Sequence, residues 1–148
     1  MTVIVWDGKI LAADSRMTEG SFLVTDNDQK LFILDPAIEY KGDELLACAL
    51  AGSSTDNEFI LEHICGHDFP SKISHKASGI FIGKKNGYSL ENDTTYLIPF
   101  SRNTKLAEGS GCQFAYSAMK LGLNAIEAAK HACKLDMACG GKIRCKEL

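Results

Sequence analysis

The amino-acid sequence predicts a layered α+β protein in which helices cover the outer faces of antiparallel sheets. Three observations lead to this fold class. Segments with strand and helix character follow one another as strands, a helix, strands, two helices and a closing strand, without regular alternation. No glycine-rich phosphate loop of the Rossmann or Walker kind is present. The length of 148 residues suits one compact domain, so residues 1–148 are expected to form a single domain.

A β-hairpin is predicted at the start of the chain. Two runs of residues that favour β-strands, 3–6 and 9–13, flank Asp7-Gly8, a dipeptide that tolerates the positive φ angles of a tight turn. Residues 15–20 are polar and predict a loop.

Short apolar runs predict the remaining strands. They are residues 22–24, 30–34, 45–51, 79–83, 88–90 and 95–99. The run 45–51 is apolar without interruption, which is typical of a strand buried on both faces. Turns are expected at 26–28 and 85–87, and a loop between Pro36 and Gly42.

The first helix is predicted from Ser53 or Ser54 to Gly66. A hydroxyl side chain caps its start, and Asp56 and Glu58 place negative charge in its first turn, where the helix dipole favours it.

Two further helices are predicted near the end of the chain. The first opens at Gly109-Ser110-Gly111 and ends at Gly122. Its apolar residues are Phe114, Tyr116, Ala118 and Leu121. The second begins at Asn124, which forms a capping box with Glu127, and presents a face of small apolar residues. Residues 136–143 are expected to return toward strand character.

Composition and charge exclude several classes of function. The net charge of −3 offers no basic stripe for a nucleic acid or an anionic membrane surface. No run of about 18 apolar residues could span a bilayer. The six cysteines follow no secretion signal, which predicts free thiols and a cytoplasmic protein. The nearest group of metal-ligand types, His63-x-Cys65-x-His67, departs from the usual spacings, so neither a metal nor another cofactor is expected.

Thr2 is the first candidate catalytic residue. A methionine followed by a small residue is normally removed, which would leave Thr2 with a free α-amine. Such a residue carries a nucleophile and a base together, because an α-amino group has a pKa of about 7.7–8.0.

Several motifs accompany Thr2 in a fixed order. Ala12-Ala13-Asp14-Ser15-Arg16-Met17-Thr18 is followed by Lys30, sixteen positions after Asp14, and then by Ala51-Gly52-Ser53 at a helix start. Gly109-Ser110-Gly111 and Asp136-Met137-Ala138-Cys139-Gly140-Gly141 complete the set. The order resembles the proteasome β-subunit family and its bacterial relative HslV, over residues 2 to about 143.

The resemblance implies a role for each matched residue. Thr2 would be the nucleophile, Lys30 the cation beside its amine, and Asp14 the carboxylate that holds Lys30. The Gly52 N–H would face the oxyanion, and Ser110 and Asp136 would be polar support around the amine.

Three further residues would contact the substrate. Thr18 would offer backbone hydrogen bonds to an extended peptide, and Met17 and Leu50 would line an apolar specificity pocket.

The resemblance also implies a fold and partners. The fold would be a four-layer αββα sandwich of the N-terminal nucleophile hydrolase type. The activity would be that of a threonine-type endopeptidase acting on a polypeptide substrate. The protein would be a homo-oligomer such as a ring, served by an ATP-dependent unfoldase.

The sequence departs from the family pattern in three places. The N-terminal hairpin is four residues shorter between Thr2 and Asp14. Only about a dozen residues separate Gly66 from Gly79, where the family has a second long helix, so one helix layer is expected to be thinned. Cys139 stands where the family has a serine, and a thiol is the weaker hydrogen-bond partner.

Two other functions fit the same residues. A catalytically inactive proteasome-fold protein could assemble or bind a partner, which retention of Met1 or separation of Thr2 from Lys30 would favour. A hydrolase of small amides would use the same nucleophile in a narrower, more polar pocket.

Overall fold

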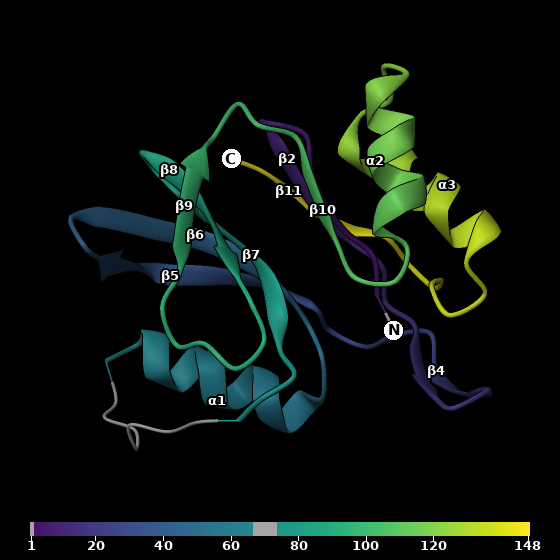
Figure 1. The fold of residues 1–148 in the computed structure, drawn as a ribbon, viewed down its shortest axis with the longest axis horizontal. Helices are drawn as coiled ribbons and strands as arrows, with labels where there is room; N and C mark the ends of the chain where they lie inside the picture. The colour runs from purple at the N-terminus through teal and green to yellow at the C-terminus, as the bar shows by residue number, and fades with distance from the viewer. Residues whose placement is uncertain (1, 67–73) are drawn as a thin grey trace.

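Two antiparallel sheets stack face to face at the centre of the molecule, with helices on both outer faces (Figure 1). This computed structural model describes residues 2–66 and 74–148. The order of layers is helix, sheet, sheet, helix pair. The predicted α+β class and the αββα order of layers are both present.

The first sheet has four strands in the order β10-β1-β2-β11. They are β1 (Ile4–Trp6), β2 (Ile10–Ala13), β10 (Leu106–Glu108) and β11 (Arg144–Glu147). The predicted N-terminal hairpin is confirmed, because β1 pairs antiparallel with β2. Asp7 stabilises the turn: its Oδ1 accepts the N–H groups of Lys9 and Ile10 at 2.9 and 2.8 Å. No strand was predicted at β10, since three residues carry too little alternation to be recognised.

The second sheet has five strands in the order β5-β6-β7-β8-β9. They are β5 (Leu31–Tyr40), β6 (Asp43–Ala51), β7 (Ser78–Gly83), β8 (Asn86–Leu90) and β9 (Ile98–Ser101). The prediction of β6 is confirmed, and Ala47 to Ala51 are buried without a break. The strand expected at 95–99 begins and ends later, at Ile98–Ser101.

The loop predicted between Pro36 and Gly42 is wrong for most of its length. β5 runs through Pro36 to Tyr40, and only Lys41 and Gly42 separate it from β6. Proline is tolerated because β5 is an edge strand whose pairing register shifts between Ile33 and Ile38.

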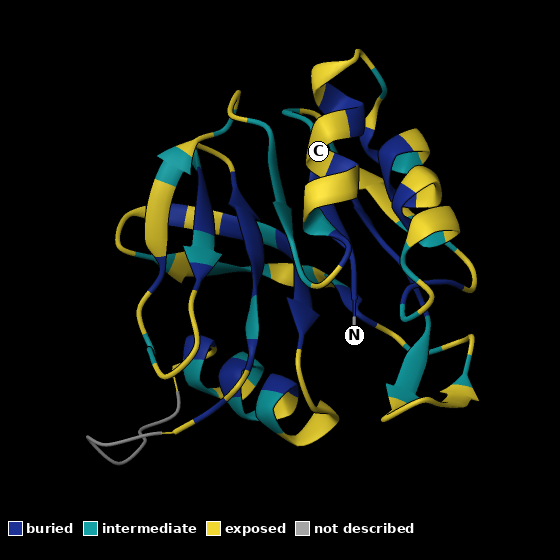
Figure 2. Ribbon diagram, turned by 45° about the vertical axis from the view of Figure 1, so that its right-hand side comes forward, coloured by how far each residue is buried: buried dark blue, intermediate teal, exposed yellow. Residues whose placement is uncertain are grey.

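Two other predicted loops are shorter than expected. Of the turn at 85–87, Asn86 and Gly87 belong to β8 and pair with β9. The polar segment 15–20 contains β3 (Met17–Glu19), which pairs with β4 (Phe22–Thr25) in a separate two-stranded hairpin. The polar residues of β3 predicted a loop, but they form a strand of a hairpin that projects from the body of the molecule and buries little of its surface (Figures 1 and 2).

The three helices of the described residues begin where the sequence predicts. α1 (Ser54–Ile64) is capped by Ser53, whose Oγ accepts the Asp56 N–H at 3.1 Å. α2 (Cys112–Lys120) follows the Gly-Ser-Gly segment, and α3 (Ala125–Leu135) has the predicted capping box. In the described part of the chain, α1 is the helix on the outer face of the five-stranded sheet. Residues 67–73 of the polar segment expected after α1 lie outside the described residues.

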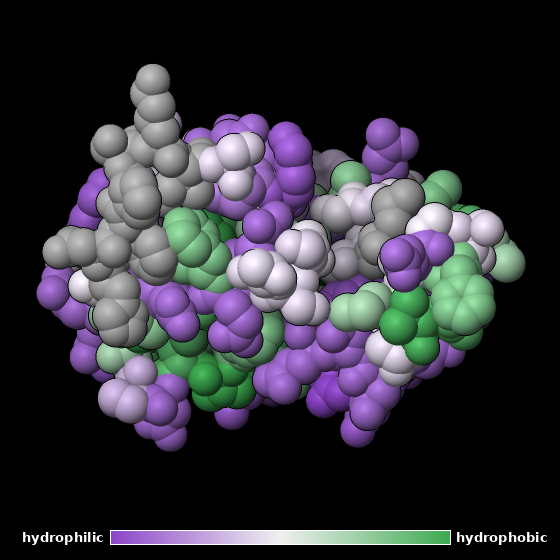
Figure 3. All heavy atoms as spheres, turned by 90° about the horizontal axis from the view of Figure 1, so that it is seen from below, coloured by the Kyte–Doolittle hydropathy of each residue, from purple (hydrophilic) through white to green (hydrophobic). Residues whose placement is uncertain are grey.

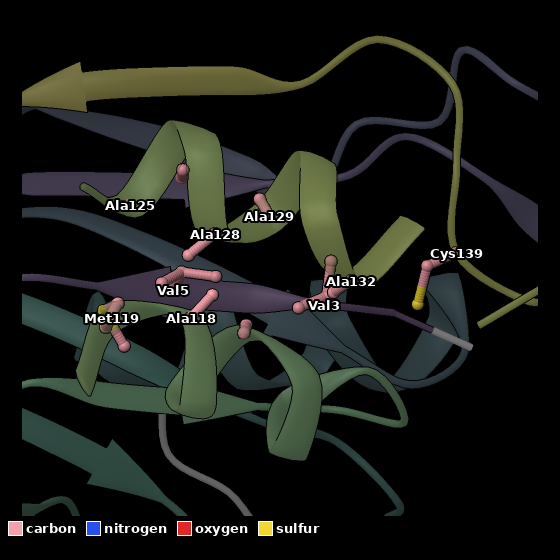
Figure 4. Close-up of a cluster of buried hydrophobic side chains, with 11 residues drawn as sticks. Val3, Val5, Ala118, Met119, Ala125, Ala128, Ala129, Ala132 and Cys139 are labelled. Carbon is pink, nitrogen blue, oxygen red and sulfur yellow. The ribbon is translucent and has the colours of Figure 1, made fainter. Parts of the chain in front are cut away.

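Small side chains fill the interface between the helix pair and the four-stranded sheet (Figure 4). Of the apolar residues noted in the α2 region, Ala118 is buried, whereas Phe114, Tyr116 and Leu121 are exposed. Ala115 and Met119 are buried with Ala118, since their spacing places them on one face. A second cluster between the sheets contains Trp6, and a third lies beneath α1.

Candidate active site

A cavity of about 600 Å³ opens where β3, the start of β5, the start of α1 and the loop before α2 meet. It lies close to the start of the chain, because Thr2 is one of its lining residues. Six predicted site residues line it: Thr2, Met17, Thr18, Lys30, Gly52 and Ser110. Asp14 and Asp136 lie behind the wall and reach it through their hydrogen bonds to Lys30 and Ser110.

Asp14 and Lys30 form a buried ion pair. The Lys30 Nζ lies 2.9 Å from Asp14 Oδ1, and the two side chains are 5% and 0% exposed. Lys30 also donates to the Arg16 carbonyl oxygen. A cation is therefore held in the cavity wall with its position fixed by two acceptors.

Asp14 joins three parts of the chain. Besides Lys30, its Oδ1 accepts the Val3 N–H at 3.0 Å. Its Oδ2 accepts the N–H groups of Gly140 at 3.0 Å and Arg16 at 3.3 Å. One carboxylate thus ties the residue after Thr2, the lysine and the C-terminal glycine segment together.

The short N-terminal hairpin does not displace Thr2 from Lys30. A hairpin that is shorter by two residues in each strand keeps every side chain on the same face, because side chains alternate along a strand. Asp14 donates its N–H to the Val3 carbonyl oxygen, so the end of the hairpin at the cavity keeps its pairing. Thr2 is 4% exposed and lines the same cavity as Lys30.

Gly109 lets the loop before α2 approach Thr2. It has a φ of +90°, and a Cβ there would overlap the Thr2 carbonyl oxygen. That oxygen also accepts the Gly111 N–H at 3.3 Å. The position therefore requires glycine both for its backbone conformation and for space.

Gly52 immediately precedes the cap of α1. Its φ is +127°, and a Cβ would approach the Ala77 Cα at 3.0 Å. Within residues 2–66 and 74–148 we find no hydrogen-bond acceptor for its N–H. A donor left unpaired at a helix start can serve a developing negative charge.

Ser110, Asp136 and Cys139 form a polar cluster beside Thr2. The Ser110 Oγ donates to Asp136 Oδ2 at 2.7 Å, and the Cys139 thiol donates to the same oxygen at 3.2 Å. Burial raises the pKa of Asp136, but the hydrogen bonds from Ser110, the Ala138 N–H and Cys139 outweigh it and the pKa is lowered. Burial raises the pKa of Cys139 to about 12, so its sulfur acts as a neutral thiol.

Leu50 does not line the cavity. It is 0% exposed and packs in the cluster beneath α1, while its neighbour Ala51 contributes to the cavity wall. Successive residues of a strand point to opposite faces, so only one of the two can face the cavity. Leu50 is thus set apart from the predicted specificity residues Met17 and Thr18.

Several wall residues were absent from the sequence-based set. They are Arg16, Glu19, Val24, Asp28, Ala51, Ser53, Ser54 and Gly109. A signal for Asp28 was present, since it lies two residues before Lys30 and side chains at that spacing share a side of an extended segment. No sequence pattern indicated that Val24 or Glu19 lines the cavity, because their positions depend on how the β3–β4 hairpin folds.

The described residues hold no group of three or more His, Cys, Asp or Glu side chains that could bind a metal ion. None of the described helices is long and apolar enough to cross a membrane.

Comparison with known proteins identifies the fold. The sequence matches no protein-family model and no curated protein. HslV from Trypanosoma brucei superposes with a TM-score of 0.73 at 16% identity, over 99% of this chain and 98% of that one. BPH from Thiobacillus denitrificans, in complex with epoxomicin, gives 0.72 at 15% identity over 100% and 98%. A second BPH structure gives 0.70 at 14% identity over 99% and 96%. The chain therefore has the proteasome- and HslV-like N-terminal nucleophile hydrolase fold.

Proposed function

We propose that the protein is a threonine-type endopeptidase whose nucleophile is Thr2 after removal of Met1. One observation carries the proposal: Thr2, Lys30, Gly52 and Ser110 line one cavity, and the lysine is held there by the buried Asp14. These are residues that the sequence motifs had singled out.

The proposed reaction has two steps. The Thr2 Oγ attacks the carbonyl carbon of the peptide bond while the α-amine of Thr2 takes the hydroxyl proton. Collapse of the tetrahedral intermediate breaks the C–N bond, the leaving amine receives that proton, and an ester remains on Thr2. Water, deprotonated by the same amine, then hydrolyses the ester and releases the carboxylate product.

The surrounding groups support this chemistry in distinct ways. The Lys30 ammonium lowers the pKa of a nearby α-amine, because a like charge disfavours its protonated form. The Gly52 N–H stabilises the oxyanion. The Ser110 hydroxyl, which contacts the Thr2 carbonyl oxygen and Asp136, would place polar groups beside the amine and help to orient it.

The β3 strand is the proposed docking edge for a polypeptide substrate. β3 belongs to a two-stranded sheet, so one of its edges is unpaired within that sheet, and Thr18 lies on it beside the cavity. An extended peptide can add to such an edge through main-chain hydrogen bonds. Met17 would contact the side chain next to the cleaved bond.

The wider expectations remain part of the proposal. We propose a single-domain cytoplasmic protein that needs no cofactor and assembles as a homo-oligomeric ring with an ATP-dependent unfoldase as its partner. The layer containing α1 would be thinner than in other proteins of this fold. The similarity to HslV supports this arrangement at the level of the fold.

An exposed apolar patch favours a second candidate function, that of a catalytically inactive partner-binding protein. Phe22, Leu23 and Val24 of β4 are 69%, 47% and 48% exposed. Apolar side chains gather at this end of the molecule (right side of Figure 3). Surfaces of this kind mark sites of contact with other proteins.

The deciding experiment is the intact mass of the purified, untagged protein before and after treatment with an electrophile selective for an N-terminal threonine. Loss of one methionine followed by complete adduct formation, absent in Thr2→Ala, supports the peptidase. Retained Met1 without adduct contradicts it and favours the partner-binding protein. Hydrolysis of small amides but not of peptides would identify the third alternative, an amidase.

A further inference from the structure

The cavity wall carries more negative than positive charge once its ion pairs are taken into account. Four ionisable side chains line it: Arg16, Glu19, Asp28 and Lys30. Lys30 is neutralised by Asp14, as described above. The remaining three determine the charge that a substrate side chain meets.

Arg16 is neutralised by Asp26. Its Nε and Nη2 donate to the two carboxylate oxygens of Asp26 at 2.7 and 3.2 Å, and its Nη1 donates to the Met137 carbonyl oxygen at 3.0 Å. The guanidinium also lies against Gly140, where a Cβ would overlap it. Arg16 therefore fastens the C-terminal segment and offers no unpaired charge to a ligand.

Asp28 and Glu19 have no such partners in the described part of the chain. No salt bridge or side-chain hydrogen bond involves either carboxylate within residues 2–66 and 74–148. The backbone of Asp28 is fixed by its N–H, which donates to the Ser15 carbonyl oxygen at 2.8 Å. Its half-buried side chain is thus held in the wall beside Lys30, with Glu19 at the exposed rim.

The apolar part of the wall suits a long aliphatic stem. Met17 and Val24 come from the two strands of the β3–β4 hairpin, and the small side chain of Ala51 also lines the cavity. Lys and Arg side chains bury such stems against apolar surface and keep their charged ends beside polar groups. A leucine side chain in the same place would remove water from the unpaired carboxylates, which is unfavourable.

We propose that this cavity selects a basic side chain, Lys or Arg, on the acyl side of the cleaved bond, with Asp28 as the main specificity residue and Glu19 as a secondary one. The inference rests on the proposed peptidase function and names its substrate class. It replaces the purely apolar pocket expected from Met17 and Leu50.

The test uses peptide substrates that differ only in the residue before the cleaved bond: Arg, Lys, Leu or Glu. We expect kcat/KM to be at least about tenfold higher for Arg and Lys than for Leu, and lowest for Glu. Asp28→Asn should lower the Arg-to-Leu ratio by about tenfold, and Glu19→Gln by less. Glu58→Gln, which removes an exposed carboxylate of α1 outside the cavity, should leave the ratio unchanged.

A binding measurement separates failure of this inference from failure of the proposed function. In Thr2→Ala, N-acetyl-arginine methylamide should shift NMR signals of the cavity residues more strongly than N-acetyl-norleucine methylamide, and Asp28→Asn should abolish the difference. Binding of the arginine ligand without any peptidase activity would overturn the proposed function and keep the specificity. Hydrolysis with equal or greater preference for Leu would overturn the specificity and keep the function.

Discussion

Replacement of Asp14 by asparagine should destabilise the whole fold as well as the cavity. The carboxylate is 0% exposed and accepts four hydrogen bonds, two on each oxygen. An asparagine side chain keeps the shape but must point its NH₂ group at two donors, whichever way it is turned. Lys30 would also lose its buried counter-charge. Breaking a buried ion pair by removing one partner costs about 3–5 kcal/mol, a large share of a total stability of about 5–15 kcal/mol.

The magnitude can be measured by urea unfolding followed by Trp6 fluorescence, since Trp6 is fully buried between the sheets. A loss of 3–5 kcal/mol corresponds to a fall in Tm of roughly 10 °C for a protein of this size. Asp28→Asn is the matched control. Its half-buried carboxylate makes no salt bridge or side-chain hydrogen bond among the described residues, so the change should alter stability by less than about 0.5 kcal/mol.

A double-mutant cycle with Lys30→Met assigns the effect to the pair. The double variant should be more stable than Asp14→Asn alone, because the unpaired buried cation is removed along with its partner. If Asp14→Asn lowers the free energy of unfolding by less than about 1 kcal/mol, the buried pair and its four hydrogen bonds are not the structural centre inferred here.

Three further predictions concern a glycine, a carboxylate and the thiols. Gly109→Ala should abolish the proposed activity and strongly destabilise the protein, because a Cβ there overlaps the Thr2 carbonyl oxygen. Gly122→Ala has a similar positive φ but open space around the Cβ, so it should lower the free energy of unfolding by only about 1 kcal/mol. Equal losses of stability for the two variants in urea unfolding would contradict this reasoning. Burial raises the pKa of Asp43, but the hydrogen bonds that its carboxylate accepts outweigh burial and lower the pKa below 3.8. The ionised carboxylate therefore stabilises the folded protein above pH 3.8, and this stabilisation is lost as the pH falls through the pKa of the folded state. Asp43→Asn should therefore flatten the acid limb of a stability–pH curve, and an unchanged limb would refute this. The exposed Cys65 should react with a thiol reagent in the native state and the buried Cys139 only on unfolding, as mass mapping would show.

Local signals were enough to predict most of the fold. Ser53 and the Asn124–Glu127 capping box marked two helix starts because caps involve neighbours in sequence. The uninterrupted apolar run of β6 marked a strand buried on both faces. The errors arose where pairing with a distant strand determines the secondary structure. Pro36 continues a strand because that strand lies at the edge of its sheet, and Asn86 belongs to β8 because it pairs with β9.

The candidate site was predicted as a set of residues but not as a charge distribution. The order of motifs pointed to Thr2, Lys30 and Gly52, which do line one cavity. The neutralisation of Arg16 by Asp26 could not be predicted, because it depends on how the β3–β4 hairpin turns back on the chain. The position of Leu50 could not be predicted for a related reason. Neighbouring residues of a strand point to opposite faces, so Leu50 packs beneath α1 while the next residue faces the cavity.

Two long-range hydrogen bonds, donated by the Gly140 N–H to Asp14 and by the Ser15 hydroxyl to the Lys142 carbonyl oxygen, have a consequence for synthesis of the chain. Residues near the two ends are joined across more than 120 positions, and β11 pairs with β2 only after residue 144 has left the ribosome. The contacts that support Asp14 and Lys30 are therefore complete only after the segment around Gly140 and β11 has been made. Under the proposed function, a cavity that depends on this C-terminal segment would keep Thr2 inactive while unfolded polypeptide, including its own chain, is still close by.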